Sequence, residues 1–104
     1  MALLPEFFPS VTGFQWDEGN SEKTWRRHRV TQVEAEEVFF NRPVLVSRAP
    51  KYSGAEARYF ALGRTDADRK LAIVFTLRGS ALRVISARPM SRRERRVYGQ
   101  AQSA

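Results

Sequence analysis

The stretch LAIVFTL, Leu71 to Leu77, is apolar at all but one position, on odd and even residues alike. Successive side chains of a strand point to opposite faces of its sheet, so this pattern is typical of a strand covered on both faces. We therefore predict that a strand from Lys70 to Arg78 lies at the centre of a sheet.

Further strand patterns lie on both sides of this run. In chain order they are Thr12 to Trp16, Val44 to Ser47, Glu56 to Gly63 and Leu82 to Ala87. The connection at 64–69 is short and polar, and residues 78–80 read as a tight Arg-Gly-Ser turn. We expect neighbouring strands to pair antiparallel, as a meander of hairpins.

Two helices are predicted between the first strand and the others. Asp17 offers a side-chain acceptor to start a helix that ends at about His28. Thr31 and Glu34 have the spacing of a capping box, which starts a second helix that Pro43 stops. Its apolar members recur at three and four residues, as one buried face requires: Ala35, Val38 and Phe39.

The segment ISARPMSRRERRVY, Ile85 to Tyr98, runs from a strand into a basic helix. Ser91 and Glu94 repeat the capping-box spacing, so the helix is predicted from Arg92 to about Tyr98. Five arginines and one glutamate give the segment a net charge of +4, out of +7 for the chain. Guanidinium groups bind phosphates through a planar fork of donors, which favours a nucleic acid partner; the alternative is a solvated helix face. The arginines are Arg88, Arg92, Arg93, Arg95 and Arg96.

These elements predict one α+β domain over residues 1–104. We expect an antiparallel sheet of about four to five strands, with two N-terminal helices and a short basic C-terminal helix all packed on one face of it. Residues 1–11, rich in Pro and apolar side chains, read as an irregular extension, and 99–104 as a flexible tail.

Composition limits the chemistry. The sequence pI is near 10.8, so the positive surface attracts polyanions such as RNA or DNA, or an acidic protein. No cysteine is present and His28 is the sole histidine, so neither a disulfide nor a zinc site is expected, although sequence does not dismiss a loosely bound magnesium. The opening does not resemble a signal peptide and no run is long enough to span a bilayer, so we expect a soluble cytoplasmic protein.

Several segments together resemble one known family, the BrnT toxins of bacterial type II toxin–antitoxin modules. They cover most of the chain from Phe14 to Tyr98 in the family's order and spacing. The segments are FQWDE (14–18), RRH (26–28), VTQVEAEEVF (30–39), EARYFALG (56–63), FTLRG (75–79) and ISARPMSRRERRVY (85–98). The chain departs from the family pattern at Asn20, where Lys is frequent, at Thr24, where Asn is common, and at Arg29, where Gly is common.

The resemblance implies a RelE-like ribonuclease fold and RNA cleavage that inhibits translation. It also implies neutralisation by a BrnA-like antitoxin with a ribbon-helix-helix DNA-binding part, in a two-plus-two hetero-tetramer. DNA would then be bound only through the antitoxin, as the complex represses its own operon.

Cleavage of RNA without a metal or cofactor needs a proton acceptor, a proton donor and fixed charge on the phosphate. Arg78 and Arg88 each end a predicted strand, where a rigid sheet can present a guanidinium at a shared concave pocket. The alternative is that each is an exposed strand-end cation. Arg58 shares a strand face with Glu56, two residues away, as a catalytic or a purely structural pair.

The acid and the base come from Glu56, His28 or Tyr98. His28 ends a helix, where an ordinary capping role competes with proton transfer. Tyr98 can reach back to Glu94, stack on a base or pack against the sheet. The helix arginines cannot all face one phosphate, so we divide them between RNA or antitoxin binding and solvent. These are Arg92, Arg93, Arg95 and Arg96.

The remaining aromatic residues are assigned to the core by their spacing: Trp16, Trp25, Phe39, Phe60 and Phe75. Phe7 and Phe8 are expected to cover a sheet edge or a partner surface. Two functions remain open. The chain is either a metal-independent toxin endoribonuclease or a non-catalytic basic module that binds RNA or an acidic protein.

Overall fold

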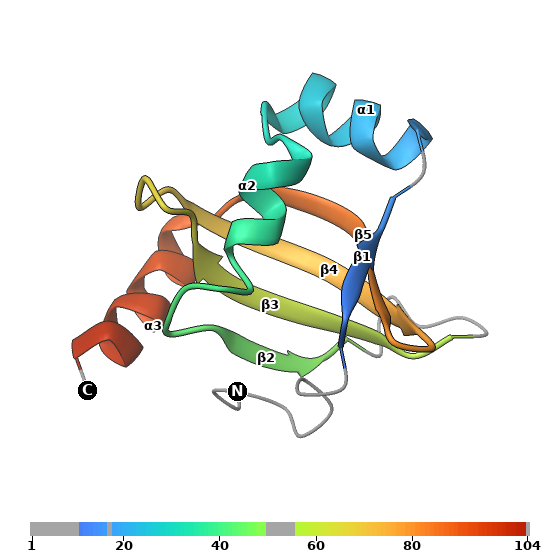
Figure 1. The fold of residues 1–104 in the computed structure, drawn as a ribbon. Coiled ribbons are helices and arrows are strands. Elements are labelled where there is room, and N and C mark those ends of the chain that lie inside the picture. The colour runs from blue at the N-terminus through green and yellow to red at the C-terminus, as the bar shows by residue number, and fades with distance from the viewer. Residues whose placement is uncertain (1–10, 17, 50–55, 104) are drawn as a thin grey trace.

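The computed structural model describes residues 11–16, 18–49 and 56–103 as an α+β domain (Figure 1). Its strands form one sheet in the order β1-β5-β4-β3-β2. Their bounds are β1 Gly13–Gln15, β2 Leu45–Arg48, β3 Arg58–Arg64, β4 Lys70–Arg78 and β5 Ala81–Pro89. The helices are α1 Glu18–His28, α2 Gln32–Glu37 and α3 Arg92–Ser103.

The apolar run from Leu71 to Leu77 forms the central strand, as the sequence predicts. β4 has the predicted bounds and pairs antiparallel with β3 on one side and β5 on the other. The expectation of a wholly antiparallel sheet is wrong for β1, which pairs parallel with β5 through Phe14 and Leu82. No hairpin joins these two strands; the chain between them crosses the domain, so a parallel arrangement is available.

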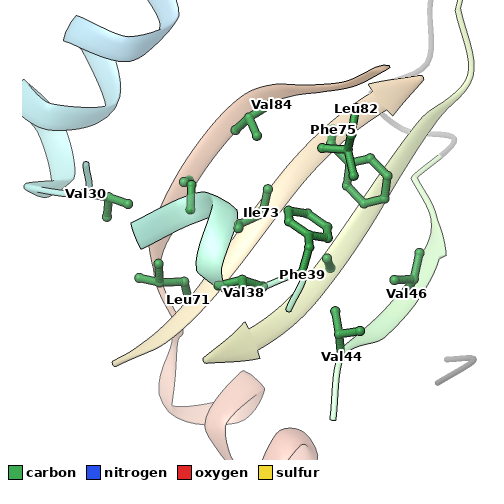
Figure 2. Close-up of a cluster of buried hydrophobic side chains, with 13 residues drawn as sticks. Val30, Val38, Phe39, Val44, Val46, Leu71, Ile73, Phe75, Leu82 and Val84 are labelled. Carbon is green, nitrogen blue, oxygen red and sulfur yellow. The ribbon is translucent and has the colours of Figure 1, made fainter. Parts of the chain in front are cut away.

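α2 covers one face of the sheet. Figure 2 shows Val38 and Phe39 lying over Ile73 of β4, within the larger of two apolar clusters. Its other members are Val44, immediately before β2, and the strand residues Val46, Ala61, Leu71, Ile73, Phe75, Leu82, Val84 and Ala87, all buried.

α3 covers part of the opposite face. Leu62 and Ala72 are neighbours in sequence of Ala61 and Leu71, so their side chains leave the sheet on the other side. There they form the second apolar cluster with Leu45, Met90 and Tyr98. The sheet therefore carries α2 on one face and α3 on the other, so the expectation that the helices pack on one face is wrong. α3 occupies only one end of its face.

α2 is shorter than predicted. The capping box of Thr31 and Glu34 is present, with each side chain accepting the other's backbone N–H. The helix ends at Glu37, well before Pro43, because the next amides bond three residues back, Phe39 N to the carbonyl of Glu36 at 3.0 Å.

α3 is longer than predicted. Ser91 and Glu94 form the expected capping box, in which the Ser91 N–H donates to Glu94 Oε1 at 2.7 Å. The helix continues to Ser103, so residues 99–103 of the predicted tail are helical. Ala101 packs on the same cluster as Tyr98, three residues earlier, and this burial favours the additional turn.

The aromatic assignments are confirmed except at Trp25. Phe39 and Phe75 are buried, and Trp16 and Phe60 are partly buried against the two clusters. Trp25 is 46% exposed, so its assignment to the core is wrong. α1 packs along β5 and buries Thr24, which turns the next residue about 100° away from the sheet. Phe7 and Phe8 lie outside the described residues.

None of the helices in the described ranges is both long enough and apolar enough to cross a lipid bilayer.

Candidate functional site

Two arginines face each other across the part of the sheet that α3 leaves uncovered. Arg58 on β3 and Arg83 on β5 are both register partners of Thr76 on β4, so all three side chains emerge on one face. It is the face opposite α2, because the flanking Phe75 and Val84 belong to the α2 cluster. Arg78, two residues beyond Thr76, joins the same face.

A carboxylate lies among these cations. Glu56 Oε1 accepts from Arg78 Nη2 at 2.9 Å, and its other oxygen accepts from Arg78 Nε at 3.2 Å. Both side chains are close to half exposed, at 43% and 47%. The predicted partner of Glu56 was Arg58; Arg78 makes the bidentate ion pair. We call Glu56, Arg58, Arg78 and Arg83 the arginine cluster.

The cations change the proton affinity of Glu56. The hydrogen bonds from Arg78 lower the pKa of this carboxyl, desolvation opposes them in part, and the charges of Arg78, Arg83 and Arg58 lower the pKa further. A lowered pKa makes the carboxylate a weak proton acceptor while it is bound to Arg78. In this arrangement its evident role is to hold Arg78.

Arg88 is held in a second bidentate pair, at the start of α3. Its Nη1 and Nη2 donate to the two oxygens of Glu94 at 2.7 and 2.9 Å. Hydrogen bonding from Arg88 and from the Ser91 amide lowers the pKa of Glu94 to about 2, despite the opposing effect of burial. One glutamate thus caps α3 and fixes Arg88.

The expectation of one pocket shared by Arg78 and Arg88 is wrong. Arg88 lies opposite Ala72 of β4, and Arg78 lies six positions further along the same strand. This is roughly 20 Å along the strand. Both lie on the face opposite α2, but at its two ends.

Tyr98 and His28 do not join the arginine cluster. Tyr98 is fully buried and its hydroxyl donates to the Pro43 carbonyl at 2.6 Å, which bears out packing against the sheet among its three predicted positions. Burial raises the pKa of its phenol. The His28 carbonyl accepts from Arg69 at 3.0 Å, and Arg69 is the residue immediately before β4. Glu56 pairs with Arg78 at the other end of β4, so His28 lies away from the arginine cluster.

The four arginines of α3 are exposed. The helix turns Glu94, Tyr98 and Ala101 inward, at spacings of four and three residues, so the arginines between them occupy the outer surface. As predicted, they cannot converge on a single phosphate.

Arg83 was missed in the sequence. It stands between the buried residues Leu82 and Val84, which assigns it to the opposite face of β5. A two-residue turn at Gly79 and Ser80 aligns position 78 with 81, and therefore 76 with 83. Alternation combined with hairpin register was the signal that would have found it.

A hollow of about 510 Å³ lies on the α2 side, between β1 and the end of α2. Phe14, Phe39, Phe40 and Arg42 help to line it, and none of the predicted site residues does. Within the described residues, no three side chains of His, Asp or Glu are grouped as a metal site requires.

Comparison with known proteins agrees with this architecture. A family model described as "Ribonuclease toxin, BrnT, of type II toxin-antitoxin system" matches residues 16–94. The crystal structure of the ribonuclease toxin BrnT from Brucella abortus superposes with a TM-score of 0.58 at 24% identity, covering 79% of this chain and all of that one. A search of curated proteins found no match.

Proposed function

This chain belongs to the BrnT family of ribonuclease toxins of type II toxin–antitoxin systems, and from that membership we propose that it is an endoribonuclease whose arginine cluster cleaves RNA without a metal. The observation that carries the proposal is the convergence of Arg58, Arg78 and Arg83 around one carboxylate, on a part of the sheet that none of the described helices covers. In the cytoplasm such cleavage of messenger RNA inhibits translation.

The reaction is attack of a ribose 2′-oxygen on the adjacent phosphorus, with departure of the 5′-oxygen. A phosphate that enters the cluster competes with Glu56 for the guanidinium of Arg78. Once Arg78 turns to the phosphate, Glu56 loses the hydrogen bonds that lower its pKa and becomes a better acceptor for the 2′-hydroxyl proton. Arg58, Arg78 and Arg83 stabilise the charge that builds on the phosphate oxygens. Water supplies the proton to the leaving 5′-oxygen.

The rest of the RNA chain runs along the sheet surface towards Arg88 and α3. A distance of roughly 20 Å along β4 accommodates several nucleotides between the cluster and Arg88. The exposed helix arginines supply salt-dependent affinity through phosphate contacts. These are Arg92, Arg93, Arg95 and Arg96.

A type II toxin is paired with a protein antitoxin, and here we assign that role to a BrnA-like ribbon-helix-helix protein in a two-plus-two assembly. The antitoxin neutralises the toxin by covering the basic sheet face, and DNA is bound through the antitoxin alone.

The test is cleavage of RNA by purified protein in the presence of a chelator. Arg78→Ala should lower the single-turnover rate roughly 10²- to 10³-fold and leave the affinity for RNA largely unchanged. Arg42→Ala removes an exposed guanidinium beside the hollow, on the α2 side, and should cleave as the unaltered chain does. Cleavage by Arg78→Ala at the rate of Arg42→Ala would refute the assignment.

A non-catalytic module that binds RNA or an acidic protein is the second candidate. It is favoured by one observation, that Arg78 and Arg88 are both occupied by carboxylates and Glu56 has a lowered pKa. Intact RNA together with tight, salt-dependent binding would establish this alternative.

A further inference from the structure

The outer surface of α1 carries an exposed indole beneath a guanidinium. Trp25 is 46% exposed, and Arg29 Cζ lies 5.2 Å from the centroid of its ring. Glu22, Trp25, Arg26 and Arg29 recur at three and four residues, so they lie on one side of the helix and its end. Thr24 is buried on the other side.

This surface is strongly basic. Residues 22–29 contain four exposed cationic side chains against the single carboxylate of Glu22, which pairs with Arg26 at 2.6 Å. The cations are Lys23, Arg26, Arg27 and Arg29. An anionic partner is therefore complementary in charge.

The backbone holds Arg29 in place over the ring. Its φ is 54°, in the left-handed region, and its N–H donates to the Trp25 carbonyl at 2.9 Å. Arg69 then donates to the carbonyl of Arg29 at 2.7 Å and pairs with Glu34 at 3.1 Å. The ring and the guanidinium are thus presented together by a helix end that is anchored to the β3–β4 connection.

We propose that Trp25 and Arg29 form a stacking platform for an unpaired base of single-stranded RNA, separate from the arginine cluster. The inference rests on the proposed function only in taking RNA as the ligand. An exposed indole offers a flat surface on which any base can stack, and the adjacent cations hold the flanking phosphates. An acidic protein is the other partner that these charges fit, and the titration below distinguishes it from RNA.

The test is a titration with a short single-stranded RNA that is 2′-O-methylated, so that the 2′-oxygen cannot attack. The chain has two tryptophans, and Trp16 is partly buried with its indole bound to Glu36 at 2.8 Å. RNA should quench the fluorescence of the unaltered chain, and Trp25→Phe should abolish the quenching. Trp25→Ala should weaken binding at least about fivefold, as loss of one stacked base does.

Two further variants control for folding and for exposed aromatic area. Arg29→Gly removes the backbone strain of a non-glycine residue in the left-handed region, so the melting temperature should not fall. The affinity for RNA should decrease, because the guanidinium over the ring is lost. Phe40→Ala removes another exposed aromatic side chain, 73% exposed at the hollow, and should bind RNA normally.

Unchanged affinity in Trp25→Ala, quenching that persists in Trp25→Phe, or an equal loss in Phe40→Ala would overturn the platform. So would a loss of affinity in Trp25→Ala for an acidic protein partner but not for RNA. Cleavage of unmodified RNA, measured on the same preparation, separates the two proposals. Quenching without cleavage would contradict the endoribonuclease and retain the platform, and cleavage without quenching would do the reverse.

Discussion

At the scale of single residues, Gly63 on β3 shows how closely α2 and its following turn approach the sheet. A Cβ at this position would collide with the side chain of Val38 and lie 3.3 Å from the Val38 carbonyl oxygen. Only glycine lets the strand pass beneath Val38, which is itself fully buried (Figure 2). This close approach excludes solvent between Gly63 and Val38 on the α2 face of the sheet. The arginine cluster lies on the opposite face.

Gly63→Ala is therefore expected to lower the free energy of unfolding by about 1–3 kcal/mol, because the added methyl group overpacks the core. Gly99→Ala is the matched control. A Cβ at Gly99 meets nothing within 4 Å, and alanine stabilises a helix interior by about 0.5–1 kcal/mol. Urea denaturation of both variants should give changes of opposite sign, and a stable Gly63→Ala would contradict the packing.

Tyr98 was predicted as a candidate catalytic residue, but its side chain is fully buried beneath α3. Tyr98→Phe should destabilise the chain by about 1 kcal/mol, because the Pro43 carbonyl loses the donor that reaches it at 2.6 Å. Cleavage of RNA should continue at the ordinary rate. A rate that collapsed while the melting temperature stayed constant would return Tyr98 to the catalytic residues.

At the scale of elements, the start of α3 joins a capping box to an ion pair. Glu94 accepts from Ser91 and from Arg88, so a single side chain fixes where the helix begins and how it is attached to β5. Because Arg88 is 40% exposed and Glu94 only 18%, the pair is partly shielded from solvent. The pair therefore contributes more to the free energy of unfolding than a fully exposed ion pair does.

The pH dependence of stability follows from the lowered pKa of Glu94. Its pKa falls from about 4.5 to about 2 on folding, so the ionised form stabilises the native chain above pH 4.5. This contribution is lost as the pH falls from about 4.5 towards 2. Glu94→Gln should cost roughly 1–2 kcal/mol at pH 7 after allowance for solvent screening. Melting curves of the two proteins should converge near pH 2; a constant difference would contradict the ion pair.

At the scale of the whole molecule, local signals in the sequence predicted the elements, and long-range contacts decided the site. The apolar run of β4 and both capping boxes are complete within a few residues, so they were readable. Trp25 was misassigned because the packing of α1 on β5 decides which side of the helix is buried. That packing buries Thr24 and exposes Trp25. The separation of Arg78 from Arg88 depends on which residues β4 and β5 bring opposite each other.

Membership of the family came from motifs spread over the chain, whereas the site residues required the sheet register. Arg83 makes this clear, because it belongs to no motif that the resemblance used. Its place beside Arg78 and Arg58 follows from the turn at Gly79 and the alternation of β5. The arginine cluster is thus a property of the folded sheet.

The cleavage rate of Arg83→Ala under single-turnover conditions, in chelator, tests this account most directly. If the cluster stabilises the transition state, the rate should fall roughly 10²-fold or more while the melting temperature and the affinity for RNA change little. Arg42→Ala, on the α2 side, should retain full activity. An Arg83→Ala protein that cleaves RNA as fast as the unaltered chain would contradict the assignment of the active site to this face of the sheet.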